Sequence, residues 1–80
     1  MPFYFFVWTP ERLEKLEQHG VEPDDFEAIV QDPHFIEPSR SSNRFVAFGY
    51  SRNDRWTACV FERLDDETIL PVTAYYPGNE

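Results

Sequence analysis

Three observations along the 80-residue chain predict an α+β fold. An aromatic run near the start is typical of a β-strand, two stretches with helically spaced apolar residues follow it, and three strand-like runs with short connections fill the second half. This length suits one domain with one core, and it excludes a TIM barrel or a dinucleotide-binding fold. We therefore expect a single domain over residues 1–80: an N-terminal strand, two short helices and then an antiparallel β-meander.

The first strand and the first helix follow each other directly. Residues 3–8 are apolar on both faces of a strand, which predicts a strand that is covered on both sides. Thr9 can cap a helix, and the proline after it suits the first helical position. Leu13 and Leu16 form a narrow apolar stripe, and Gly20 is expected to end this helix.

A second helix is predicted after Pro23-Asp24-Asp25, because a proline and two acidic residues favour the first turn. Its apolar face is formed by Phe26, Ile29 and Val30, and Asp32-Pro33 ends it. A short edge strand is expected over residues 34–37. The meander is then expected over residues 44–50, 55–63 and 67–76, joined by connections of hairpin length.

The register of this meander determines which side chains share a face. If Tyr50 lies opposite Arg55, then Val46 lies opposite Cys59. One face would then hold Val46, Phe48, Cys59, Phe61, Leu70, Val72 and Ala74. The other would hold Phe45, Ala47, Trp56, Ala58, Val60, Ile69 and Tyr75. Neither face is polar and two short helices cover only one, so the second packs on the first strand or is presented to a partner.

Composition and charge limit the function classes. An aromatic content of 18% supports a packed core, and the net charge of −8 argues against strong non-specific binding of RNA or of DNA. The single cysteine, Cys59, cannot form an intramolecular disulfide, which fits a reducing compartment. Neither a signal peptide nor an apolar run of membrane-spanning length is recognisable, so we expect a cytoplasmic protein without a membrane partner.

The positive charges are concentrated in one part of the chain. Residues 38–63 contain five of the seven Lys and Arg residues: Arg40, Arg44, Arg52, Arg55 and Arg63. This concentration has two interpretations. The arginines either form a local basic site on an acidic protein or pair with the plentiful acidic residues at the surface.

Most kinds of chemical site find no support. His19, His34 and Cys59 lack metal-ligand spacing, and the glycines do not cluster into a phosphate-binding loop, so no metal and no cofactor are predicted. Cys59 lies between apolar neighbours and is expected to be a small core residue. A histidine just before a helix-ending glycine, as His19 is, is typical of a helix end.

The remaining chemistry depends on arginine. RNA cleavage by the 2′-hydroxyl requires stabilisation of the phosphorane-like transition state, which Arg40, Arg44 and Arg55 could supply. Proton transfer could come from His19, Glu62, Tyr75 or Tyr76. Along one hairpin Arg44 and Arg55 would lie on the order of 15 to 20 Å apart, so they would contact successive phosphates more easily than one.

Several short motifs, in order along nearly the whole chain, carry a family resemblance. They are residues 6–11, His19-Gly20-Val21, Asp25-Phe26-Glu27, Asp32-Pro33, Arg44, Phe48-Gly49, Asp54-Arg55, Val60-Phe61-Glu62 and Leu70-Pro71-Val72-Thr73-Ala74. In this order the chain resembles the BrnT-like toxin family, whose members adopt a small RelE-like ribonuclease fold. Typical members are basic, whereas this chain carries a net charge of −8.

The resemblance implies a toxin-like component of a bacterial type II toxin–antitoxin system, with endoribonuclease activity and a cognate antitoxin as its partner. The catalytic residues would be Arg44, Arg55 and His19, and the RNA contacts would come from Arg40, Arg52 and Tyr75. The alternative is a non-catalytic interaction module of the same fold. It would bind a partner, or form a homodimer, through an apolar sheet face. Convergence of Arg40, Arg44 and Arg55 on one groove would favour the nuclease.

Overall fold

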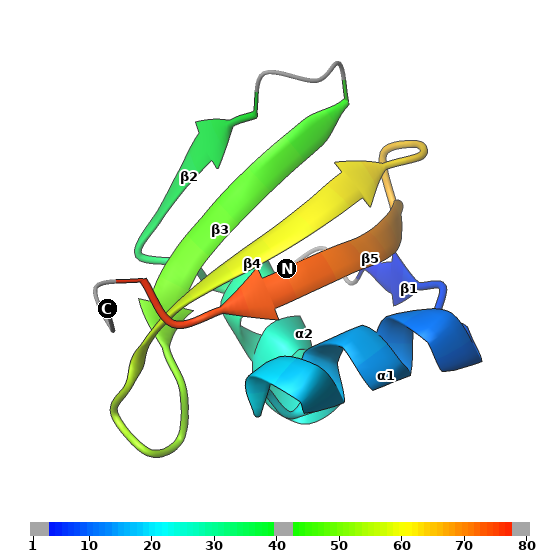
Figure 1. The fold of residues 1–80 in the computed structure, drawn as a ribbon. Coiled ribbons are helices and arrows are strands. Elements are labelled where there is room, and N and C mark those ends of the chain that lie inside the picture. Colours follow the sequence, from blue (N-terminus) through cyan, green and yellow to red (C-terminus); the bar gives the residue numbers. More distant parts are fainter. Residues whose placement is uncertain (1–3, 40–42, 78–80) are drawn as a thin grey trace.

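The computed structural model describes residues 4–39 and 43–77, and it contains a five-stranded mixed sheet and two helices (Figure 1). The elements are β1 (Phe5–Phe6), α1 (Pro10–His19), α2 (Pro23–Gln31), β2 (Phe35–Pro38), β3 (Arg44–Tyr50), β4 (Trp56–Arg63) and β5 (Thr68–Tyr75). The strand order is β1-β5-β4-β3-β2, with β1 parallel to β5 and the other neighbours antiparallel. The predicted α+β class, order of elements and meander are confirmed.

Helix α1 begins and ends at the predicted residues. The Thr9 hydroxyl oxygen accepts a hydrogen bond from the backbone N–H of Arg12 at 3.3 Å. Gly20 follows the helix with a φ of 76°, a left-handed conformation that glycine adopts without steric cost. The backbone N–H of Val21 then donates to the carbonyl of Leu16 at 3.0 Å, so the chain turns sharply toward α2.

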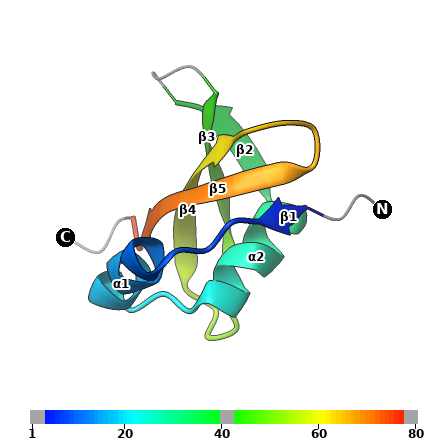
Figure 2. The same ribbon diagram turned by 90° about the vertical axis from the view of Figure 1, so that its right-hand side faces the viewer.

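The core lies between the helices and one face of the sheet. Figures 1 and 2 show both helices below β5, where the twisted sheet curves over them. The buried apolar side chains are Leu16, Val21, Phe26, Ile29, Val30, Ala47, Cys59, Phe61, Ile69 and Ala74. Cys59 is therefore a small core residue, as predicted. The expected stripe on α1 is reduced to Leu16, because Leu13 is 41% exposed and lies outside this cluster.

The prediction of a long N-terminal strand covered on both sides is wrong. Strand β1 has only two residues and lies at the edge of the sheet, and Phe5 is 65% exposed. The backbone N–H of Val7 still donates to the carbonyl of Ile69 at 2.9 Å, and the side chain of the next residue, Trp8, turns toward α2. Its indole N–H donates to a Glu27 carboxylate oxygen at 2.6 Å, and its ring packs edge to face on Phe26.

The predicted register of β3 and β4 is also wrong, by one residue. Tyr50 lies opposite Trp56 instead of Arg55, and Ala47 instead of Val46 lies opposite Cys59. The turn causes this shift. The backbone N–H of Ser51 donates to the carbonyl of Arg55, so the connection covers residues 51–55 rather than 51–54.

This one-residue shift reassigns the two faces of the sheet. The inner face, toward the helices, holds Phe45, Ala47, Gly49, Thr57, Cys59, Phe61, Ile69, Pro71 and Ala74. The outer face holds Arg44, Val46, Phe48, Tyr50, Trp56, Ala58, Val60, Glu62, Leu70, Thr73 and Tyr75. An irregularity between Val60 and Phe61 shifts the pairing with β5, so Val72 has no opposite residue. Val46 and Phe48 thus do not share a face with Cys59, contrary to the prediction.

Candidate functional site

The outer face carries a group of aromatic rings in mutual contact. Phe35 stacks on Phe48 with ring centroids 4.7 Å apart, and Phe48 stacks on Trp56 at 5.8 Å. Tyr50 meets Trp56 edge to face at 5.0 Å, and His34 meets Tyr50 in the same way at 5.2 Å. We call these five residues the aromatic cluster. It spans β2, β3, β4 and the residue before β2.

Much of the aromatic cluster is accessible to solvent. Phe35 is 48% exposed and Tyr50 is 54% exposed, while Phe48 and Trp56 are half-buried. Both described helices pack against the opposite face, so no helix of residues 4–39 and 43–77 covers these rings. Contiguous exposed apolar surface of this kind is typical of a site that binds another molecule. Aromatic rings in particular bind apolar groups and cations.

Arg44 lies on the outer face at the far end of the hairpin from Tyr50. Its Nε lies 3.5 Å from a carboxylate oxygen of Glu62, directly across on β4. Both side chains are partly exposed, so solvent screens the pair and its contribution to stability is small. The pairing nevertheless places a carboxylate beside the guanidinium, where an incoming phosphate would have to compete with it.

Arg55 lies at the other end of the hairpin, where β4 begins. Its guanidinium carbon lies 3.7 Å from the ring centroid of Tyr76, and the Tyr76 hydroxyl donates to the carbonyl of Gly20 at 2.8 Å. These contacts bring Arg55 to the end of α1, whose last residue is the exposed His19. Arg44 pairs with Glu62 near the opposite end of β4. At the rise of a β-strand, Glu62 lies about 20 Å from Arg55.

Arg52 connects the turn over residues 51–55 to the start of α2. Its Nε donates to a carboxylate oxygen of Asp25 at 3.0 Å, and its Nη2 lies 3.8 Å from Asp24. The hydrogen bond to Asp25 and the attraction of that carboxylate raise the pKa of Arg52 above its usual value. Because Asp25 is only 8% exposed, this pair holds a nearly buried carboxylate in place. Its geometry indicates a structural contact.

The other predicted site residues lie apart from these. Tyr75 is exposed on the outer face opposite Ala58 of β4. Arg63, which was counted among the arginines of residues 38–63 but not as a site residue, pairs with Asp66 at 3.8 Å. Arg40 lies outside the described residues. Burial raises the pKa of the Cys59 thiol to about 12, which keeps it protonated and unreactive.

The structure therefore separates the predicted catalytic residues. Arg55 and His19 lie near the same corner, at the end of α1, while Arg44 lies on the outer face at the opposite end of the hairpin. Within the described parts of the chain, no groove gathers Arg44 with Arg55. Each of Arg44, Arg52 and Arg63 has a carboxylate partner.

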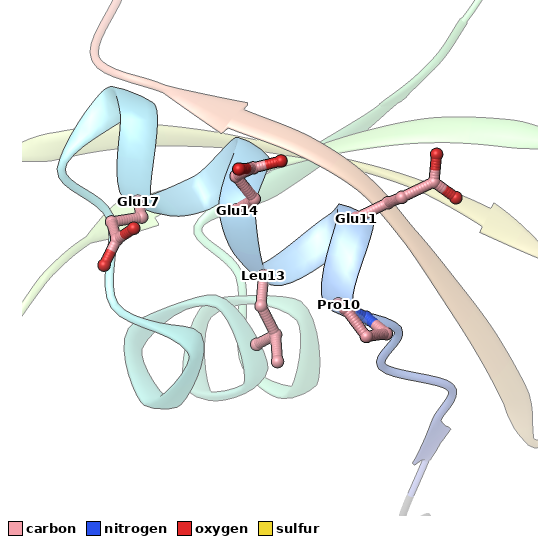
Figure 3. A pocket seen from close by; sticks show the side chains of 5 residues that line it. All are labelled: Pro10, Glu11, Leu13, Glu14 and Glu17. Atoms are coloured by element: carbon pink, nitrogen blue, oxygen red, sulfur yellow. The ribbon is translucent and has the colours of Figure 1, made fainter.

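A shallow hollow of about 480 Å³ lies along the exposed side of α1. Its lining consists of Pro10, Glu11, Leu13, Glu14 and Glu17 (Figure 3). The three carboxylates point in different directions and do not converge on a common position (Figure 3). The hollow therefore offers no chemistry beyond a solvated acidic helix face.

Two further observations concern other classes of site. Residues 4–39 and 43–77 hold no group of three His, Cys, Asp or Glu side chains placed to bind a metal ion. Neither of the two described helices is long and apolar enough to cross a membrane.

The aromatic cluster was not predicted from the sequence. The expected register placed Phe48 on the face of Cys59 and separated it from Trp56. Counting the turn as residues 51–55 would have brought both rings to one face. The position of Phe35 depends in addition on the pairing of β2 with β3, which the turn does not determine. Comparison of the chain with family models, with curated proteins and with solved structures finds no match.

Proposed function

We propose that this chain is a non-catalytic protein-interaction module whose partner docks on the aromatic cluster. The observation that carries the proposal is the outer face, which no helix of the described residues covers and on which Phe35 and Tyr50 are about half exposed. Full burial of a large apolar side chain contributes about 1.5–3 kcal/mol, so each of these two rings can still contribute on the order of 1 kcal/mol. Such partly exposed aromatic anchors are typical of interface centres.

The arrangement of the arginines supports this choice over a nuclease. Arg44 and Arg55 lie at opposite ends of the hairpin, and Arg44 already pairs with Glu62. Binding of a scissile phosphate would need several cations around one position. A partner protein needs no such convergence, because its affinity comes from buried apolar area and complementary charge.

The net charge indicates the chemistry of the partner. At −8, the chain attracts a basic protein and repels a second copy of itself. The resemblance to BrnT-like toxins adds one candidate, since a cognate antitoxin is also a protein partner. In that setting the aromatic cluster would be the surface on which the antitoxin binds.

Site-specific photo-cross-linking tests the proposal in the full chain. Benzoylphenylalanine replaces Tyr50 in the aromatic cluster, and the matched control replaces Glu14 on the exposed side of α1. We expect position 50 to form an adduct with one basic protein in the native cells and position 14 to form none. The purified partner should bind the parent, and its affinity for the Tyr50→Ser variant should be about fivefold lower.

Three results would overturn the proposal. The first is the absence of any adduct at position 50 in a folded chain, and the second is an adduct only with a second copy of this protein. The third comes from incubation with total RNA. Cleavage by the parent that is lost in an Arg44→Ala, Arg55→Ala double variant would establish a nuclease. Equal absence of cleavage by both proteins is the expected result.

A further inference from the structure

We propose, on the basis of the proposed function, that the partner binds by adding an extended, arginine-containing segment to the free edge of β2. Among residues 4–39 and 43–77, strand β2 is the last strand of the sheet and has β3 as its single neighbour. All four of its residues are exposed, including Ile36 at 44%. Exposed edge strands are templates for pairing with another chain.

The register shows which main-chain groups of β2 face outward. Ser39 donates its backbone N–H to the carbonyl of Arg44, directly opposite, so this is a hydrogen-bonded pair of the ladder. Bonded and non-bonded pairs alternate in an antiparallel ladder, so Glu37 and Phe35 also bond to β3. The N–H and C=O of Ile36 therefore point away from the sheet.

Pro38 is consistent with this orientation. It occupies the other outward-facing position of β2. A residue there donates no hydrogen bond to β3, so the missing N–H of proline does not weaken the β2–β3 ladder. Its carbonyl remains as an outward acceptor. The edge thus offers one donor and two acceptors, all on Ile36 and Pro38, to an incoming strand. With so few hydrogen bonds, the incoming segment must gain much of its affinity from side chains.

Side chains on the outer face supply that second contribution. The stacked rings of Trp56, Phe48 and Phe35 form a row across β4, β3 and β2, with interplanar angles of 15° and 25°. The row ends at Phe35, whose ring is half exposed at the sheet edge. A strand added beside β2 would place its own side chain against this ring, as the next member of the row.

Arginine is the side chain that fits this position. A planar guanidinium stacks on an aromatic face, as Arg55 already does on Tyr76 at 3.7 Å. Glu37 lies two residues beyond Phe35 and hence on the same face of β2. Glu37 forms no ion pair within residues 4–39 and 43–77. Its carboxylate can therefore pair with a cation of the incoming strand.

A second copy of the chain is the less suitable occupant. Each copy carries a charge of −8, so approach of two β2 edges is opposed by repulsion. In a pair of β2 edges, both strands would also contain Pro38, which has no N–H to donate to the other strand. A basic extended segment from another protein meets neither obstacle. Charge complementarity thus selects the heterologous partner.

The first test is a titration of the full chain with the acetylated, amidated hexapeptide Thr-Arg-Val-Arg-Val-Thr, followed by calorimetry and by backbone amide NMR shifts. We expect shifts concentrated on β2 and on the aromatic cluster. A peptide with both arginines replaced by glutamate should not bind. A peptide N-methylated at alternate amides should bind about fivefold or more weakly, because strand pairing needs those N–H groups.

Variants of β2 separate the two contributions. Ile36→Pro removes the outward N–H and should weaken binding of the arginine peptide about fivefold, whereas the matched Ile36→Thr keeps that N–H and should bind nearly as the parent. Phe35→Ala removes the ring and should also weaken binding about fivefold. Circular dichroism and the NMR spectrum establish that each variant is folded. The N-methylated peptide tests the same bond with the unaltered parent.

The outcomes that overturn strand addition differ from those that overturn the proposed function. No binding of the arginine peptide, equal binding of the glutamate peptide, or insensitivity to both N-methylation and Ile36→Pro would each exclude this mode. A cross-link to a partner at position 50 would then still support docking on the outer face. Dimerisation in sedimentation that Ile36→Pro abolishes would assign the edge to a second copy and would also overturn strand addition.

Discussion

Replacement of Gly49 by alanine tests how closely α2 packs on the sheet. Gly49 lies on the inner face of β3, and a Cβ atom there would lie 3.1 Å from Cγ2 and 3.4 Å from Cγ1 of Ile29. Carbon atoms prefer a separation of about 3.5–4.0 Å. Ile29 cannot easily retreat, because it is 3% exposed within the core and the Arg52–Asp25 hydrogen bond holds the first turn of α2.

The expected loss follows from two opposing contributions. Overpacking a core costs about 1–3 kcal/mol, while alanine in a strand is favoured over glycine by about 0.5–1 kcal/mol. We therefore expect Gly49→Ala to lower the free energy of unfolding by about 1 kcal/mol. For a domain of this size such a loss lowers Tm by about 4–8 °C. Urea unfolding followed by tryptophan fluorescence, with linear extrapolation, measures it.

A double-mutant cycle with Ile29 identifies the cause. Ile29→Ala removes both Cγ atoms and costs about 2–5 kcal/mol by itself, but in that background Gly49→Ala should be neutral or stabilising. Ile29→Val keeps both Cγ atoms and serves as the control, in which the cost of Gly49→Ala should persist. The reasoning is refuted if Gly49→Ala stabilises the parent, or if its cost is the same in the Ile29→Ala background.

Three further predictions concern the core, the turn and the first helix. Because the pKa of Cys59 is raised to about 12, its thiol should resist alkylation at about pH 9 until the chain unfolds. The unfolded thiol ionises at about pH 8.5, so the free energy of unfolding should fall by about 1.4 kcal/mol per pH unit above that value, relative to Cys59→Ala. An identical pH profile for both proteins would contradict this. Arg52→Met should lower Tm, because it leaves the nearly buried carboxylate of Asp25 unpaired. Adding Asp25→Asn to this variant should recover part of the loss. If the Tm of Arg52→Met equals that of the parent, Arg52 has no structural role. Thr9→Ala should cost about 0.5–1 kcal/mol in urea unfolding, whereas Thr9→Ser should cost little.

Local signals in the sequence were sufficient to predict where the helices begin and end. Thr9 caps α1, Gly20 ends it in a left-handed conformation, and α2 spans the residues from Pro23 to Gln31, directly before Asp32-Pro33. These features depend on backbone geometry within a few residues, so they are readable without tertiary information. The antiparallel pairing of β3, β4 and β5 followed from their short connections in the same way, whereas the parallel pairing of β1 with β5 was not predicted.

The candidate site was less predictable, because its residues meet through strand pairing. The prediction had separated Phe48 from Trp56, yet the two rings stack 5.8 Å apart. Arg44 and Arg55 were individually plausible phosphate ligands, but their contacts with Glu62 and Tyr76 depend on the register and on the path of the chain after β5. Residue type alone carries no information on such distances.

By itself the sequence determined the α+β class, the order of the elements, the helix ends and the burial of Cys59. Tertiary structure decided the register, which side chains form the outer face, and which cations are paired. The physical reason is the two-residue period of a β-strand. Extension of the turn to Arg55 moved every side chain of β4 to the opposite face relative to β3, and this placed Trp56 beside Phe48 in the aromatic cluster.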